Sequence, residues 1–258
     1  FLDVNFFKSM IHFLSDLSMM KNVHSFLRTC LVVGVLWLVS SLPAYAVTPI
    51  GDCTDLHNIG ANATGTYVLT TSIDCDSVNP FIPLSNFQGT LDGNNYEITN
   101  LHFQSGENYQ GVFSSMDGAT VKNLGIINSS VGVNYQAGVL ASSISNSIIR
   151  NVSATTTFTS GALLSVQGGL AGSIYNSFLN QVHVNANISG SYSLVGGIAG
   201  VVSGSSTIMN SSVNGSISVH QNTDTNSLVG GLVGTMSDSL IINSYSSTSV
   251  SGEGNDVG

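Results

Sequence analysis

Apolar residues recur from residue 111 to residue 250 in short runs separated by Gly, Ser, Thr and Asn, and the pattern returns at intervals of 27 to 34 residues. Each unit opens with a Gly before two mostly apolar positions, and the five openings are Gly111, Gly138, Gly169, Gly197 and Gly231. The stretch from Leu240 to Val250 shows no helical period, so strands are predicted. Units this short cannot bury their own apolar face, which predicts that neighbouring units stack as a solenoid.

Three columns of residues support this alignment. The first lies five residues after each Gly and contains Met116, Ser143, Ile174, Val202 and Met236. The second lies ten or eleven residues after each Gly and contains Val121, Ile148, Leu179, Ile208 and Ile241. The third lies at eleven to thirteen residues and contains Asn123, Asn151, Asn180, Asn210 and Asn243. Asn tolerates a left-handed corner, and stacked Asn side chains can hydrogen-bond along a ladder.

The predicted fold is therefore all-β, with parallel strands that advance about 4.8 Å from one coil of the solenoid to the next. Two alternatives remain, because Gly- and Ser-rich tracts are often flexible linkers and because short, regularly spaced strands also suit a β-sandwich. Regularly placed Val, Ile and Leu argue against a linker. The register anchored by Gly favours coils over a sandwich.

The segment from Gly230 to Gly252 resembles the GLUG motif, a repeat of bacterial surface and secreted proteins. Residues 168–190 and 196–218 are similar, whereas Gly111 and Gly138 open more degenerate copies. Residues 67–75 and 87–101 resemble the lead-in that commonly precedes such repeats. Over residues 50–258 the resemblance implies a right-handed parallel β-helix of the kind found in filamentous adhesins. It implies no single biochemical activity.

Residues 20–46 have the pattern of a secretory signal peptide. Lys21 and Arg28 supply a basic start, Cys30 to Ser41 is an apolar run, and small residues precede a predicted cleavage after Ala46. A membrane-spanning helix is the alternative, but it needs about 20 apolar residues. Residues 1–19 are then an upstream extension, and no stable transmembrane segment is expected after cleavage. The predicted route is export through the periplasm to the cell surface or the medium.

After cleavage, residues 47–105 are expected to form an N-terminal cap and lead-in, and residues 106–258 the repeats. The final Asp256-Val-Gly matches the start of earlier units, which predicts a chain truncated from a longer protein. Cys53 and Cys75 remain, and an oxidising compartment predicts a disulfide between them. Two free thiols or a metal pair are the alternatives, but no further Cys or His lies at zinc-ligand spacing.

Composition narrows the classes of partner. The chain has five Lys plus Arg against fourteen Asp plus Glu, its charged fraction is 7% and its hydrophobic fraction is 42%. Nucleic-acid binders cluster Lys and Arg, and disordered chains combine low hydrophobicity with high net charge. The composition therefore argues against both classes.

No catalytic constellation, metal site or cofactor site is predicted. Asp74 and Asp76 share one face of a strand and could bind a cation, but a solvated strand end is favoured because cation sites need several oxygen ligands. Asp92 begins an Asp-Gly-Asn-Asn stretch that is typical of a turn. The histidines after the signal are scattered and form no His-Glu-x-x-His motif; they are His57, His102, His183 and His220.

Three tyrosines lie two to five residues before the opening Gly of a unit, and these are Tyr109, Tyr135 and Tyr192. They are predicted to lie near one edge of the coil, where aligned rings could stack on the sugars of a host or surface glycan. An aromatic ladder that packs only on itself is the alternative.

Three functions are open. An exported, non-catalytic β-helix for adhesion, binding or display is favoured by the repeats and the polar surface. The second is an accessory arm of a larger secreted enzyme whose catalytic domain lies beyond residue 258, since GLUG repeats resemble segments of large secreted metallopeptidases. The third is a carbohydrate-active enzyme. The scarcity of ionisable groups argues against the third, because only Lys122 and Arg150 are basic after the signal.

Overall fold

The computed structural model describes residues 46–61, 63–104, 107–133, 135–161, 165–190, 194–219, 227–252 and 256–257. Residues 46–258 form one compact unit. The predicted upstream extension and all of the predicted signal peptide except Ala46 lie outside the described residues, so both stay predictions. Within the described ranges, no helix combines the length and apolar character that a membrane crossing requires.

The strands of the described residues form three sheets, and the paired strands run parallel throughout. The largest sheet contains β1 (Val47–Ile50), β2 (Thr66–Leu69), β3 (Ile73–Asp74), β4 (Thr90–Thr99), β7 (Thr120–Val133), β10 (Ile148–Gly161), β13 (Phe178–Gly190), β16 (Thr207–Met209), β17 (Ser212–Val219), β20 (Leu240–Ile242), β21 (Tyr245–Ser246) and β22 (Ser249–Gly252). The second contains β5 (Tyr109–Gln110), β8 (Gln136–Ala137), β11 (Val166–Gly168), β14 (Leu194–Gly196), β18 (Leu228–Gly230) and β23 (Asp256–Val257). The third contains β6 (Phe113–Asp117), β9 (Ala141–Ser145), β12 (Ala171–Tyr175), β15 (Ala199–Ser203) and β19 (Val233–Met236).

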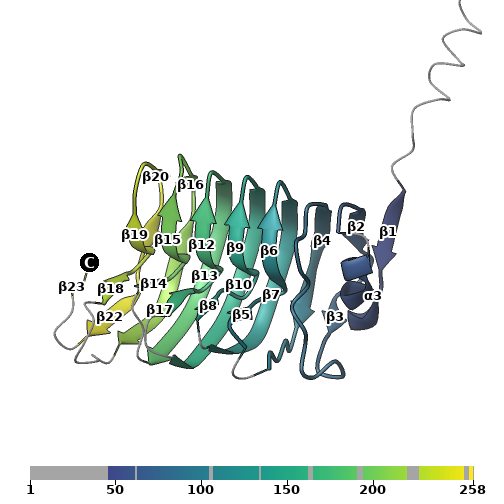
Figure 1. Cartoon of the computed structure of the whole chain (residues 1–258), viewed down its shortest axis with the longest axis horizontal. Helices are drawn as coiled ribbons and strands as arrows, with labels where there is room; N and C mark the ends of the chain where they lie inside the picture. The colour runs from purple at the N-terminus through teal and green to yellow at the C-terminus, as the bar shows by residue number, and fades with distance from the viewer. Residues whose placement is uncertain are drawn as a thin grey trace, which may run out of the picture. The chain divides into compact units, whose positions relative to one another are not determined.

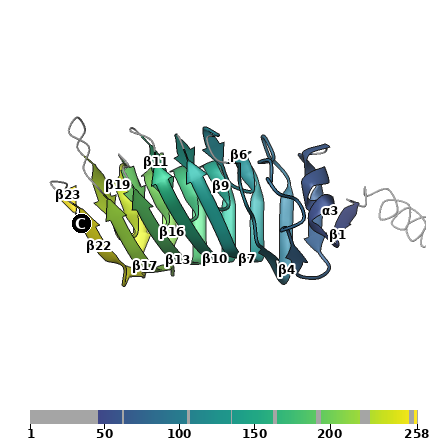
Figure 2. The same cartoon turned by 90° about the horizontal axis from the view of Figure 1, so that it is seen from below.

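Each coil passes through the three sheets in turn. One coil runs through β8, β9 and β10, and the next runs through β11, β12 and β13 directly beside it (Figure 1). About six such coils stack into a parallel β-solenoid. Figure 2 shows the long strands β7, β10, β13 and β17 side by side on one face. The predicted all-β parallel solenoid is confirmed.

A short helix lies at the N-terminal end of the stack (Figure 1). It is α3 (Cys53–Asn58), and the 3₁₀ turn η1 (Ile59–Ala61) follows it directly. Asp52 caps the helix, because its side chain accepts a hydrogen bond from the backbone N–H of Asp55 at 2.9 Å. Cys53 and Leu56 are buried and join the hydrophobic core. The helix thus contributes apolar side chains to the core at this end of the stack.

In the first four units the two predicted apolar columns line the interior, with the second unit one residue later than predicted. In the last unit Met236 is 45% exposed and Ile241 is partly buried. Met116 and Ile174 both pair with Ile144, so Ile144 replaces Ser143 in the first column. Ile149 replaces Ile148 in the second column, and Ile148 is 39% exposed. The reason is that Gly138 aligns with Gly168 and not with the predicted opening Gly169, since Ala137 pairs with Gln167 and Ala141 with Ala171. Positions counted from Gly138 therefore fall one residue short, which places the wrong side chain in the interior.

Both glycines of each Gly-Gly pair stack in the last three units. Gly168, Gly196 and Gly230 pair in register in the second sheet. The predicted openings follow them in the same register, and the Gly169 N–H donates to the carbonyl oxygen of Gly197 at 3.1 Å. A Cβ added at Gly168 would lie 1.9 Å from the carbonyl oxygen of Ala171. Only Gly fits there, because the backbone turns sharply from the second sheet into the third.

The predicted asparagine corner is present with one substitution. Left-handed backbone occurs at Asn123, Asn151, Gln181, Asn210 and Asn243. Gln181 therefore occupies the corner where Asn180 was predicted, because this unit carries Gln at the corner and its nearest Asn lies one residue earlier. Asn180 stands one residue earlier, and its Oδ1 accepts a hydrogen bond from Asn210 Nδ2 at 2.9 Å. The ladder itself is confirmed, since Asn151 Nδ2 donates to Asn123 Oδ1 at 2.9 Å.

Buried serines form a second ladder inside a neighbouring corner. The backbone N–H of Ser147 donates to Ser177 Oγ at 3.0 Å, and the N–H of Ser177 donates to Ser206 Oγ at 3.1 Å. The Ser177 hydroxyl donates in turn to the carbonyl oxygen of Tyr175 at 2.7 Å. These hydroxyls satisfy backbone groups at corners where the strand ladder is interrupted. Ser residues of the repeats therefore have a structural role. A flexible linker would not require them at fixed positions.

Candidate functional site

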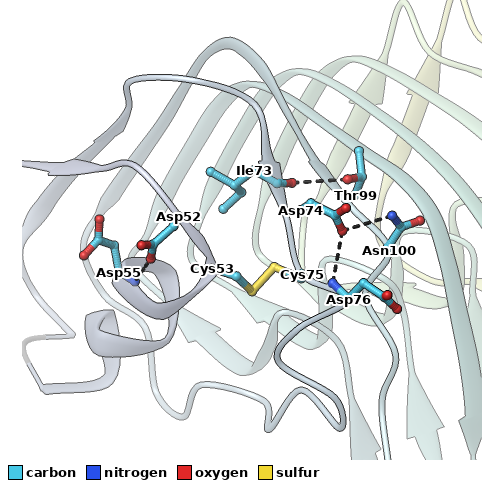
Figure 3. Close-up of a disulfide and its surroundings, with 9 residues drawn as sticks. All are labelled: Asp52, Cys53, Asp55, Ile73, Asp74, Cys75, Asp76, Thr99 and Asn100. Carbon is cyan, nitrogen blue, oxygen red and sulfur yellow. Dashed lines mark hydrogen bonds between the residues drawn. A yellow bond between two sulfur atoms is a disulfide. The ribbon is translucent and has the colours of Figure 1, made fainter.

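The predicted disulfide between Cys53 and Cys75 is confirmed (Figure 3). Cys53 is the first residue of α3 and Cys75 directly follows β3, and their Cα atoms lie 5.1 Å apart. Both residues are buried. The disulfide links the capping helix to the first sheet. In the loop-entropy model, a bond across a sequence separation of 22 residues stabilises the folded state by about 3 kcal/mol.

Asp74 is held within a small hydrogen-bond network beside the disulfide. It accepts hydrogen bonds from the backbone N–H of Asp76 and from the Asn100 amide, both at 3.0 Å (Figure 3). These two bonds, together with the nearby His102, outweigh a small effect of burial and lower the pKa of Asp74. In the ranges that the structure describes, no group of three or more His, Cys, Asp or Glu side chains is arranged to hold a metal ion.

His102 links the acidic corner to the next coil. Its Nε2 lies 3.4 Å from Asp76 Oδ1, and its Nδ1 lies 3.1 Å from Ser130 Oγ. Asp76, His102 and Ser130 thus follow one another in the same order as the Asp, His and Ser of a serine-hydrolase triad. The side chains lie on the open surface, however, with Asp76 71% exposed, so water competes for each contact. The sequence predicted scattered surface histidines and missed this chain of contacts, which joins three coils.

The Asp92 carboxylate on β4 contacts three polar groups. Its Oδ1 accepts from the Asn94 N–H at 2.9 Å and from the Asn123 amide at 3.1 Å, and its Oδ2 lies 3.0 Å from Lys122 Nζ. Burial alone would raise the pKa of Asp92, but these bonds and the Lys122 charge together lower it. The predicted turn at Asp92–Asn95 is instead an irregularity within β4, because the strand continues through these residues. Left-handed backbone at Asn94 and Asn95 accompanies a break in register between Asp92 and Tyr96.

Tyr109 and Tyr135 lie together on one edge of the solenoid, as predicted. Their ring centroids are 5.8 Å apart at an interplanar angle of 83°, and the side chains are 49% and 48% exposed. The rings therefore pack on each other and also present area to solvent. Tyr192 lies outside the described residues. A ligand role for these tyrosines stays a prediction.

A groove opens beside Tyr109 that the sequence did not predict. Its volume is about 400 Å³, and its lining residues are Phe81, Ile82, Pro83, Gln104, Glu107, Asn108, Tyr109 and Ser114. These residues come from three separate parts of the chain. Only Tyr109 carries a repeat signal, because the residues around Ile82 and Glu107 have no equivalent in the later units.

Part of the chain matches a known protein family. Residues 53–156 match the N-terminal region of the M26 IgA1-specific metallo-endopeptidases. That match covers the cap, the disulfide, the groove and the first repeat coils. The similarity to GLUG repeats stays a prediction.

Two solved structures share the fold. An IgA1 protease superposes with a TM-score of 0.59 and 21% sequence identity, over 80% of this chain and 16% of that protein. A Bacteroides ovatus protein that was assigned to the immunoglobulin A1 proteases superposes with a TM-score of 0.50 and 18% identity, over 78% of this chain and 76% of its own. At these identities the likeness concerns the fold alone.

Sequence similarity also extends to halomucin from Haloquadratum walsbyi. The two are 31% identical over 163 residues, which is 56% of this chain. The chain spans only 2% of the length of halomucin and 16% of the IgA1 protease that it superposes on.

Proposed function

We propose that residues 46–258 are a rigid, non-catalytic arm of a larger exported bacterial protein related to the M26 peptidases. The observation that carries this proposal is the match of residues 53–156 to the N-terminal region of that family. The fold shared with two IgA1-protease structures is consistent with it. The M26 family is specific for IgA1, so the corresponding substrate of the whole protein is immunoglobulin A1.

The architecture suits an arm that sets a distance. About six coils that each advance about 4.8 Å give a stack roughly 30 Å long. In-register backbone hydrogen bonds and a continuous apolar interior join every coil to its neighbours. Such a stack can hold a bound protein and a catalytic domain in a fixed relation, and fixed geometry lowers the entropic cost of reaction.

Export is part of the proposal. The Cys53–Cys75 disulfide is of the kind that persists in oxidising compartments, and the M26 similarity favours a secreted bacterial protein. The predicted signal peptide would provide the route through the periplasm, with cleavage after Ala46.

Adhesion or display at the cell surface is the second candidate. The half-exposed Tyr109–Tyr135 pair supports it. The M26 match favours the arm, because it covers a contiguous 104-residue stretch, residues 53–156, that includes the non-repetitive cap.

Reading the coding sequence beyond residue 258 separates the two candidates. For an arm we expect a peptidase domain with a His-Glu-x-x-His zinc motif in the same reading frame. The full-length protein should then cleave purified immunoglobulin A1, and a chelator should abolish the cleavage. A reading frame that continues only into repeats and a surface anchor would overturn the arm in favour of adhesion or display.

A further inference from the structure

The groove beside Tyr109 is pre-formed by the fold. One wall is the segment at residues 81–84, which pairs with Phe103 and with Phe113 at the start of β6. The Phe81 N–H donates to the carbonyl of His102 at 2.7 Å, and the Leu84 N–H donates to the carbonyl of Val112 at 2.9 Å. The Ser114 N–H donates back to the carbonyl of Leu84 at 2.9 Å. The wall at residues 81–84 is thus fixed by backbone hydrogen bonds, so a ligand would not have to order it.

The apolar side of the groove is unusually exposed. Ile82 is 60% exposed and Tyr109 is 49% exposed, and Tyr135 extends the aromatic surface to the next coil. Aromatic rings offer large contact area with a polar tip, which makes them common at recognition surfaces. The volume of about 400 Å³ lies at the small end of the range for ligand pockets.

The polar side offers both donors and acceptors. Glu107 contributes a carboxylate, and Gln104 and Asn108 contribute carboxamides. The Ser114 hydroxyl donates to the carbonyl oxygen of Leu84 at 3.5 Å. A carboxylate accepts two hydrogen bonds at once, and a carboxamide both accepts and donates. No Lys or Arg occurs between residues 46 and 121, so no cationic side chain from that stretch can neutralise Glu107.

We propose that this groove binds neutral carbohydrate, over about one or two sugar rings. The C–H face of a pyranose packs on the Tyr109 ring, and adjacent hydroxyls donate to Glu107 and exchange hydrogen bonds with Gln104 and Asn108. Acidic sugars are disfavoured because their carboxylate would face Glu107. This binding is independent of whether a peptidase domain follows.

A proline-rich peptide is the main rival occupant, because such peptides dock in grooves lined by aromatic residues. It would use the Tyr109 and Ile82 surface but has few hydrogen-bond donors to offer Glu107. Carboxylate and carboxamides left without partners under a bound ligand cost affinity. The polar lining therefore favours a polyhydroxylated ligand.

The test uses the full chain on an array of neutral and acidic glycans, with octaproline as the peptide probe. We expect binding to neutral glycans, and saturation-transfer NMR with the disaccharides lactose, cellobiose and chitobiose measures it in solution. Tyr109→Ala should weaken binding by about tenfold or more, and Tyr109→Phe should retain most of it. Glu107→Gln should weaken binding of the neutral sugars and reduce the discrimination against acidic ones.

Tyr175→Ala is the matched control, because Tyr175 is 53% exposed but lies on β12, outside the groove. It should leave binding unchanged. Thermal unfolding of each variant shows whether a loss reflects the groove or the fold, and Tyr109→Phe covers the case in which Tyr109→Ala fails to fold. Absence of neutral-glycan binding, equal losses in the Tyr109→Ala and Tyr175→Ala variants, or binding of octaproline alone would each overturn the proposal.

Discussion

Carboxylates begin the amide ladders at the corners of the solenoid. In three places the amide of an Asn donates to an Asp of the preceding coil, and the acceptor–donor pairs are Asp74–Asn100, Asp92–Asn123 and Asp117–Asn146. Further amides then follow from coil to coil, as from Asn128 to Asn100 and from Asn151 to Asn123. A charged acceptor makes a stronger hydrogen bond than a neutral one. These carboxylates therefore anchor the ladders at their N-terminal ends.

Substitution of Asp92 tests whether these carboxylates stabilise the fold. We expect Asp92→Asn to lower the free energy of unfolding at pH 7 by about 1 kcal/mol, because it weakens the bonds from Asn94 and Asn123 and removes the partly exposed Lys122 ion pair. The folded pKa of Asp92 is lowered, so its contribution is present above the unfolded value of about 3.9 and is lost as pH falls through the folded pKa.

Urea unfolding of both proteins as a function of pH measures the effect. The difference between them should shrink on acidification. Glu97→Gln, which removes an exposed negative charge without these partners, is the control and should change stability little at pH 7. A difference for Asp92→Asn that stays constant down to acidic pH would contradict the role of the carboxylate charge.

Glycine positions determine where one coil can turn closely over the next. We expect Gly168→Ala to destabilise the solenoid by about 2–4 kcal/mol, because its Cβ would overlap backbone atoms of Ala171 and Ala199 and force the second and third sheets apart. Gly60→Ala is the matched control, since its Cβ would make only an ordinary contact, 3.5 Å from a Leu84 side-chain atom. Thermal unfolding compares them, and similar melting temperatures for the two variants would contradict this account.

Serine hydroxyls also stabilise the corners, because they accept hydrogen bonds from buried backbone N–H groups. Ser177→Ala would leave the buried N–H of Ser147 without its acceptor, and an unsatisfied buried donor costs about 1–3 kcal/mol. Ser153→Ala, at an exposed position of β10, serves as the control and should be nearly neutral. Denaturant unfolding distinguishes the two. Equal stability of the two variants would mean that the hydroxyl ladder adds nothing to the fold.

At the scale of whole elements, the sequence was enough to predict the coils but not their register. Apolar and Asn positions repeat because every coil must bury the same face and turn the same corner, and this periodicity is visible in one chain. The register of Ile144 and Ile149 was missed because Gly138 has no second Gly beside it, so the pattern does not show that it aligns with the first Gly of the later pairs. Gly168 was not singled out because either Gly of a pair satisfies the pattern, and an added Cβ would overlap backbone atoms at both positions.

The candidate site was less predictable than the fold. Cys53 and Cys75 could be paired because only two cysteines follow the signal, and Tyr109 and Tyr135 could be placed on one edge because both precede a repeat. Ile82 and Glu107 could not, since they lie in stretches without a repeat. The contact of Asp76 with His102 likewise joins residues from different coils, and nothing in their spacing indicates it.

For the whole molecule, the central claim is that this solenoid positions a substrate for a catalytic domain and performs no chemistry itself. The direct test compares the full-length protein with a variant that lacks residues 46–258, by measuring kcat/KM on a folded protein substrate and on a short peptide that carries the same cleavage site. The arm predicts a loss of about tenfold or more on the folded protein and little change on the peptide. Equal losses on both substrates, or no loss on either, would contradict it.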